Sequence, residues 1–90
     1  MEISRTVTIK NKLGLHARAA TKLAQLAQQF SANVVIKQAD KSANADSVMA
    51  LLMLASNQGK EVTVAATGND AQQAVDEICQ LICNKFDESE

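Results

Sequence analysis

The chain has 90 residues, enough for one small domain spanning residues 1–90, and 47% of them are hydrophobic, enough for a modest core. The net charge of −1 and the absence of Trp and Tyr argue against nucleic acid as a partner, because there is no basic surface and no aromatic stacking platform. No apolar run is long enough to span a bilayer and no signal-peptide pattern opens the chain. We expect a cytoplasmic monomer with no membrane partner.

The first predicted element is a half-buried strand over Ile3 to Lys10, in which apolar and polar residues alternate. Arg5 interrupts the apolar face, and its charged end is expected to reach water near the end of the strand. Residues 11–14, Asn-Lys-Leu-Gly, then connect this strand to a helix.

A helix with one apolar stripe is predicted from Ala17 to Phe30, because apolar residues recur there at steps of three and four. The chain's single histidine, His16, then lies at the N-cap. The positive end of a helix disfavours imidazolium, so the ring is expected to be a neutral nucleophile. The unpaired N–H groups of the first turn would stabilise a dianion, and Arg18 adds a cation suited to phosphoryl oxygens. This combination predicts a histidine that accepts and returns a phosphoryl group.

The alternative is that the histidine is an ordinary loop residue at the start of a helix. Taken alone, His16 favours that alternative. The loop glycine at position 14 and the guanidinium of Arg18 within the first turn shift the balance towards phosphoryl chemistry.

Two short strands and a second helix follow. Val34 to Ile36 are predicted as a strand, and Lys41 to Asn44 as a weakly patterned return strand. Asp46 or Ser47 offers an N-cap for a helix from Val48 to Ala55, which the sequence Asn-Gln-Gly at residues 57–59 ends.

The second helix has no polar side. One stripe, Leu51, Leu54 and Ala55, is expected to face the sheet, which leaves Val48, Met49 and Leu52 partly exposed. Exposed apolar patches tend to be binding sites, and methionine adapts to several partners. The alternative is that neighbouring loops cover these side chains. A phosphoryl carrier needs a non-polar surface around its histidine so that partners can dock, and we therefore interpret this face as a docking surface.

The chain closes with a strand over Glu61 to Thr67, a break at Gly68 and a last helix capped by Asn69 or Asp70. The apolar stripe of this helix is expected to run from Ala71 to Phe86. The acidic residues 87–90 are expected to fray.

Cys79 and Cys83 lie four residues apart in the last predicted helix, and we interpret them as two buried thiols in a reducing cytoplasm. Two cysteines and one distant histidine are too few for a zinc site, so no metal and no cofactor are expected. The order of elements indicates an α+β domain, with an antiparallel sheet carrying all its helices on one face and water on the other.

These residues resemble a known family. Gly14-Leu15-His16-Ala17-Arg18 is similar to the active-site motif of HPr, the histidine phosphocarrier of the bacterial phosphotransferase system, and Ser47 at the start of a short apolar helix matches the family's second landmark. The element order agrees along the whole chain. Within the family, residues 44–48 and 50–54 and the tail from Phe86 to Glu88 look most like NPr, the paralogue of the nitrogen-related branch.

The resemblance implies an open-faced β-sandwich, with four antiparallel strands in the order 1-4-2-3 and three helices on one face. Topology rules alone also allow a ferredoxin-like order. It implies that His16 is phosphorylated on Nδ1 by an enzyme I-type phosphohistidine, with phosphoenolpyruvate as the source, and passes the group to an EIIA-type protein. Arg18 and the backbone N–H groups of Ala17 and Arg18 would steady the phosphoryl group, and Ser47, Val48, Met49 and Leu52 would dock both partners.

Two residues qualify the resemblance. Ala19 stands where the family motif usually has proline, which implies a less rigid loop before the helix, with activity retained. The serine that matches Ser47 is a regulatory phosphorylation site in some HPr proteins, but an ordinary N-cap explains Ser47 as well, and the acidic Asp46 before it makes kinase regulation the weaker hypothesis.

Other functions stay open beside the carrier, which is a relay protein and not an enzyme. The chain could be an HPr of the sugar-transport branch, or an interaction module that docks through its second helix with an idle histidine. An autonomous hydrolase or metalloenzyme is weakly supported, because one histidine and two cysteines give neither a triad nor a ligand set.

Overall fold

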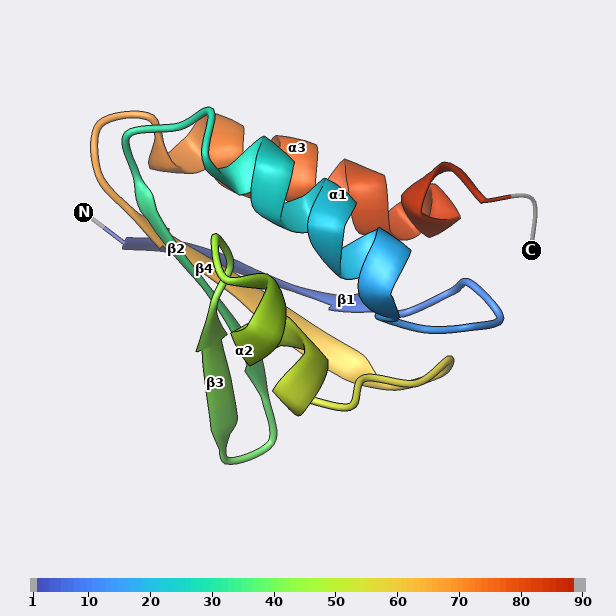
Figure 1. Ribbon diagram of the computed structural model, residues 1–90. Helices are drawn as coiled ribbons and strands as arrows, with labels where there is room; N and C mark the ends of the chain where they lie inside the picture. Colours follow the sequence, from blue (N-terminus) through green and yellow to red (C-terminus); the bar gives the residue numbers. More distant parts are fainter. Residues whose placement is uncertain (1, 89–90) are drawn as a thin grey trace.

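The computed structural model describes residues 2–88, and within them four strands form one antiparallel sheet with three helices on one face (Figure 1). The longest of these helices has 13 residues, so none in this part of the chain is long and apolar enough to cross a membrane. The elements are β1 Glu2–Thr8, α1 Ala17–Ala27, β2 Asn33–Gln38, β3 Lys41–Asn44, α2 Val48–Met53, β4 Glu61–Thr67, α3 Ala71–Cys83 and a short 3₁₀ helix, η1, Lys85–Asp87.

The strands lie in the order β1-β4-β2-β3, which confirms the expected sheet. The last strand in sequence, β4, is central, and its Ala66 pairs with Ile3 of β1 on one side and Val34 of β2 on the other. The weakly patterned strand β3 pairs along β2, from Lys41 opposite Gln38 to Asn44 opposite Val35.

The core lies between the sheet and the helices. In Figure 1, α1 and α3 run side by side over the sheet, and α2 is a shorter helix next to β3 and α1. The opposite face carries polar side chains, such as Thr6 and Thr63, whose hydroxyls hydrogen bond at 2.9 Å. The largest fully buried hydrophobic side chains are Phe86, Ile9, Leu23, Ile36, Leu51, Leu54, Ile78, Ile82, Val62, Val64 and Val75.

Helix ends differ most from the sequence prediction. Helix α1 ends at Ala27 instead of Phe30, and α2 ends at Met53 instead of Ala55. Ala55 has a positive φ of 55° and is exposed, so its predicted place against the sheet is wrong; Leu51 and Leu54 do face the core.

The N-cap of α3 is Asp70, and its carboxylate serves another loop. It accepts hydrogen bonds from the backbone N–H groups of Ser31 and Ala32 at 2.8 and 2.7 Å and makes no side-chain cap bond to its own helix. The carboxylate therefore ties the turn after α1 to the start of α3.

The predicted pair of buried thiols is half wrong, because Cys79 is buried whereas Cys83, close to the end of α3, is exposed. Burial raises the pKa of Cys79, an effect that the nearby Arg5 guanidinium partly opposes. Cys79 is therefore a packing residue.

Candidate functional site

The loop between β1 and α1 is fixed against the segment that follows α2. The Leu15 N–H donates to the carbonyl oxygen of Ser56 at 2.8 Å, and Gly14 has a positive φ of 69°. A Cβ at Gly14 would lie 2.5 Å from that same oxygen, so only glycine allows this approach. The loop therefore brings His16 to one defined place at the start of α1.

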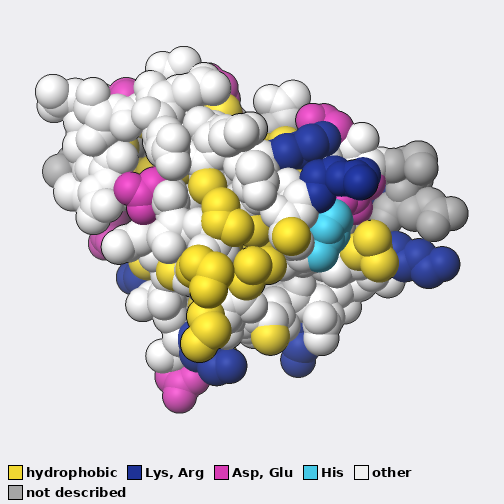
Figure 2. All heavy atoms as spheres, viewed as in Figure 1, with side chains coloured by type: hydrophobic (Ala, Val, Ile, Leu, Met, Phe, Trp, Pro, Cys, Tyr) yellow, Lys and Arg dark blue, Asp and Glu magenta, His cyan; other side chains and the backbone are white. Residues whose placement is uncertain are grey.

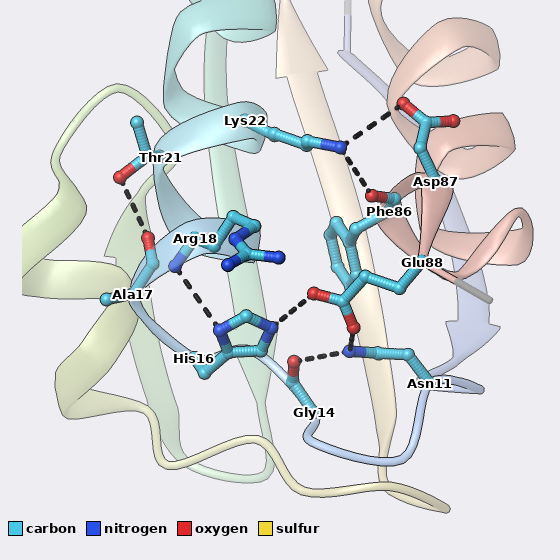
Figure 3. A network of polar contacts seen from close by, with 10 residues as sticks. All are labelled: Asn11, Gly14, His16, Ala17, Arg18, Thr21, Lys22, Phe86, Asp87 and Glu88. Atoms are coloured by element: carbon cyan, nitrogen blue, oxygen red, sulfur yellow. Dashed lines mark hydrogen bonds and ion pairs between the residues drawn. The ribbon is translucent and has the colours of Figure 1, made fainter. Parts of the chain in front are cut away.

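His16 is the N-cap of α1, as predicted, with extended backbone angles. Its Nδ1 accepts a hydrogen bond from the backbone N–H of Arg18 at 3.3 Å, and its carbonyl oxygen accepts from the Ala20 N–H at 2.8 Å. The side chain is 26% exposed, so the ring lies at the surface, and its Nδ1 faces the first turn of the helix (Figure 3). This is the position expected for a phosphoryl acceptor.

The other ring nitrogen, Nε2, is hydrogen bonded to the carboxylate of Glu88 (Figure 3). A carboxylate only accepts and a backbone N–H only donates, so the two partners together assign the hydrogen to Nε2 and the lone pair to Nδ1. The surroundings of His16 thus select the tautomer in which Nδ1 is the nucleophilic atom.

Glu88 is a site residue that sequence reasoning missed. Its second oxygen accepts a hydrogen bond from Nδ2 of Asn11 at 3.0 Å, and the same Nδ2 donates to the Gly14 carbonyl at 2.7 Å. The prediction of a frayed tail is therefore wrong for Asp87 and Glu88, while residues 89–90 lie outside the described part of the chain. The available signal was Asn11 itself, a polar residue in the loop before the histidine that turns out to be fully buried.

Glu88 is ionised at neutral pH. Desolvation raises its pKa, but the hydrogen bonds from Asn11 and His16 and the electrostatic attraction of His16 and Arg18 outweigh desolvation. The net effect holds the pKa of Glu88 below its ordinary value, so the carboxylate is available as an acceptor for Nε2.

A hollow of about 900 Å³ opens beside the ring. The Arg18 guanidinium lies next to His16 in Figure 3, and Lys22 reaches from α1 to the end of the chain, donating to the Phe86 carbonyl at 2.9 Å. Cationic side chains at the mouth of a hollow that contains a helix N-terminus favour an anionic group. The lining residues are Lys12, Leu13, His16, Ala17, Arg18, Lys22, Asp87 and Glu88.

An apolar patch lies on α2, close to the histidine. Met49 is 72% exposed, Met53 75% and Leu52 37%, and Val48 is partly buried. These four side chains are the α2 patch. Figure 2 shows hydrophobic side chains gathered on this face and reaching the histidine, beyond which Lys and Arg side chains begin. The predicted exposure of Val48, Met49 and Leu52 is confirmed, and Met53, which the sequence reading did not single out, extends it.

Ser47 is the N-cap of α2, and Asp46 is not. The Ser47 Oγ accepts a hydrogen bond from the Ala50 N–H at 3.2 Å and so pairs one of the backbone donors left free in the first turn. Among residues 2–88, no three His, Cys, Asp or Glu side chains come close enough together to hold a metal ion.

Comparison with known proteins supplies the family. The sequence model described as "PTS HPr component phosphorylation site" matches residues 3–84, which include His16, Arg18 and the α2 patch. This chain belongs to the HPr family.

HPr-family relatives match along almost the full chain. A protein of Shewanella violacea named phosphocarrier protein NPr is 54% identical over 88 residues, covering 98% of this chain and 97% of the relative. The phosphocarrier protein HPr of Cupriavidus necator is 44% identical over 88 residues, covering 98% and 99%. The NPr of Escherichia coli is 44% identical over 89 residues, with the same coverage.

The fold of this HPr-family chain also matches solved structures. The crystal structure described as HPr-C-His from Thermoanaerobacter tengcongensis superposes with a TM-score of 0.93 at 38% identity, covering 98% of this chain and 99% of the other. The open-faced sandwich implied by the motif is therefore confirmed.

Proposed function

We propose that this chain is a histidine phosphocarrier of the nitrogen-related phosphotransferase branch. It takes a phosphoryl group from a phosphohistidine of an enzyme I-type protein, with phosphoenolpyruvate as the source, and passes it to a histidine of an EIIA-type protein. The observation that carries the proposal is the orientation of His16, whose Nδ1 faces the Arg18 N–H at the start of α1.

In the accepting step, the lone pair of Nδ1 attacks phosphorus and a new N–P bond forms. The N–P bond of the donor breaks, and its electron pair returns to the donor's nitrogen. The Nδ1 lone pair is then no longer available to the Arg18 N–H. That N–H, the Ala17 N–H and the Arg18 guanidinium donate hydrogen bonds to the phosphoryl oxygens. The delivering step is the same exchange in reverse with a different partner.

The α2 patch supplies the docking surface in this proposal. Its exposed side chains are Met49, Leu52 and Met53. Figure 2 shows hydrophobic side chains gathered on the face that carries the histidine, so a partner seated on this face covers the histidine and excludes water from the transfer. Donor and acceptor bind one at a time, because both need the same face. Methionine side chains suit two different partner surfaces. Ser47 borders this patch; its cap bond to Ala50 supports a structural role first and a regulatory phosphosite second.

The central experiment is phosphorylation with phosphoenolpyruvate and an enzyme I-type protein, followed by intact mass. We expect a gain of one phosphoryl group that is lost on acid treatment and absent in His16→Ala. A label that persists in His16→Ala, or that survives acid, contradicts the proposal.

A comparison of enzyme I-type donors tests which branch of the phosphotransferase system this chain serves. The names of the relatives from Shewanella violacea and Escherichia coli support the nitrogen-related branch, although the Cupriavidus necator HPr is as similar as the second of them. We expect faster transfer from the nitrogen-branch enzyme I paralogue than from its sugar-branch counterpart. Equal rates, or a preference for the sugar-branch donor, would assign this chain to the other branch.

A further inference from the structure

The end of the chain is built to place one carboxylate at the histidine. Phe86 is fully buried, and Lys85, Phe86 and Asp87 all have positive φ angles, between 54° and 64°. Three consecutive non-glycine residues in this region cost free energy, and the surrounding structure has to hold them there. They turn the chain so that Glu88 approaches the loop before α1 and meets Nε2, on the opposite side of the ring from the Arg18 backbone N–H (Figure 3).

Glu88 is held at both of its oxygens. One accepts from Nδ2 of Asn11 at 3.0 Å, and the other contacts Nε2 of His16. Asn11 is fully buried, and its second bond, to the Gly14 carbonyl, fixes the direction in which the amide points. The Glu88 side chain is only 14% exposed. A carboxylate anchored in this way constrains the ring that it contacts.

We propose that Glu88 is a positioning residue of the relay, which keeps the hydrogen on Nε2 of His16 both before and after phosphorylation. The proposal rests on the proposed function, in which His16 carries the phosphoryl group. The low pKa of Glu88 supports it, because an ionised carboxylate is the required acceptor.

The consequence for the chemistry follows from the atoms. Attack by Nδ1 gives a ring with substituents on both nitrogens, phosphorus on Nδ1 and hydrogen on Nε2, and therefore a positive charge, which the Glu88 carboxylate stabilises. When the N–P bond breaks towards the next acceptor, its electron pair returns to Nδ1 and a neutral imidazole leaves with its Nε2 hydrogen in place. Without that hydrogen the leaving group would be an imidazolate, which is far more basic. An acidic partner that holds the tautomer of a catalytic histidine acts in the same manner in serine protease triads.

The charged groups around the carboxylate fit this role. Arg18, Lys12, Lys22 and Asp87 line the same hollow, and Lys22 lies 3.7 Å from the Asp87 carboxylate. Asn11 and His16 are the groups that donate to Glu88 itself. The carboxylate thus works within a mainly cationic rim without neutralising Arg18 through a direct bond.

The first test reads the tautomer in the unphosphorylated protein. Proteins labelled with ¹⁵N are compared at a pH where the ring is neutral: wild type, Glu88→Ala, Glu88→Gln and, as a matched loss of one carboxylate, Glu77→Gln on α3. We expect the Nε2–H form in the wild type and in Glu77→Gln. Glu88→Gln should largely retain that form, because an amide oxygen still accepts, and Glu88→Ala should show a mixture with the Nδ1–H form.

The second test measures the initial rate of phosphoryl transfer to an EIIA-type acceptor, across a range of pH, after each variant has been phosphorylated. We expect a loss of about tenfold in Glu88→Ala and a smaller loss in Glu88→Gln, with no change in Glu77→Gln. In Glu88→Ala the transfer rate should begin to fall at a lower alkaline pH than in the wild type. Without the carboxylate, Nε2 of the phosphorylated ring loses its proton more readily.

The outcomes separate this proposal from the function. An unchanged tautomer in Glu88→Ala overturns the positioning role, whatever the protein does with phosphate. Transfer rates within twofold of the wild type in both Glu88 variants overturn it as well. If the wild type is never phosphorylated on His16, the proposed function fails, while the tautomer measurement still stands.

Discussion

The ammonium of Lys22 on α1 donates a hydrogen bond to the carbonyl oxygen of Phe86 at 2.9 Å and so fastens the first helix to the segment that carries Glu88. Replacing Lys22 by Met keeps the aliphatic stem and removes the donor. We expect a loss of about 0.5 to 1 kcal/mol in the free energy of unfolding, because Lys22 is partly exposed and water replaces part of the bond. The diagnostic measurement is faster hydrogen exchange at the backbone amide of Glu88. The control variant is Lys41→Met, which changes an exposed lysine on β3.

Gly14→Ala tests the fixed approach of the loop to the segment after α2. The added Cβ would meet the Ser56 carbonyl oxygen at 2.5 Å, and φ is 69°, so strain and a clash act together. We expect the free energy of unfolding, measured by urea denaturation, to fall by about 1 to 3 kcal/mol and His16 to be displaced. The matched control is Gly59→Ala, where φ is also positive but nothing lies within 4 Å of the new Cβ. Equal losses in the two variants would mean that the approach to Ser56 does not matter.

The strands, the helices and His16 could be predicted because each depends on local periodicity or on the start of one helix. The order of the strands in the sheet was implied by the resemblance to the HPr family and not by periodicity. The strand pattern around Val62 and Val64 and the cap position of His16 are both readable over a few residues. The contact between His16 and Glu88 is not, since it joins the first helix to the end of the chain and depends on a backbone turn that no residue type announces. A short acidic tail is typical of a frayed terminus, and only the tertiary structure assigns its Glu88 to the site.

Helix ends were less predictable for a related reason. The apolar run continues past Met53, so periodicity alone extends α2 to Ala55, whereas the real end is set by the chain turning with a positive φ at Ala55. Cys83 is the last residue of α3 and is exposed although Ile82 beside it is buried, so Cys83 lies off the apolar stripe of the helix. Local patterns identify an element; its neighbours decide where it stops.

The low pKa of Glu88 predicts how stability changes with pH. A carboxyl group whose pKa is lower in the folded than in the unfolded protein stabilises the fold fully above the unfolded value, close to 4.5, and loses that contribution as pH falls through the folded value. The difference in unfolding free energy between wild type and Glu88→Gln should therefore be present at neutral pH and shrink below about pH 4.5. Denaturant titrations at several pH values check this, and a difference that grows on acidification would reverse the sign.

Ala19→Pro restores the residue that the HPr motif usually has. Position 19 lies in the first turn of α1, and the first helical hydrogen bond is made by Ala20, so proline removes no helix bond. We expect the free energy of unfolding to rise by about 0.4 to 1 kcal/mol, because proline lowers the conformational entropy of the unfolded chain. The rise should appear as a melting temperature a few degrees higher. A lower melting temperature would show that the buried position of Ala19 does not tolerate the ring.

Leu52→Glu puts a charge into the centre of the α2 patch without touching the core, because Leu52 is 37% exposed while its neighbour Leu51 is fully buried. We expect the fold and its melting temperature to be little changed. Phosphoryl transfer from the donor and phosphoryl transfer to the acceptor should each fall by at least tenfold, since a desolvated unpaired charge weakens docking. Asn69→Glu adds the same charge in the exposed loop between β4 and α3 and should leave transfer unchanged. His16→Ala complements the pair: if partner complexes need Leu52 but every downstream effect survives the loss of His16, the chain is an interaction module and its histidine is idle.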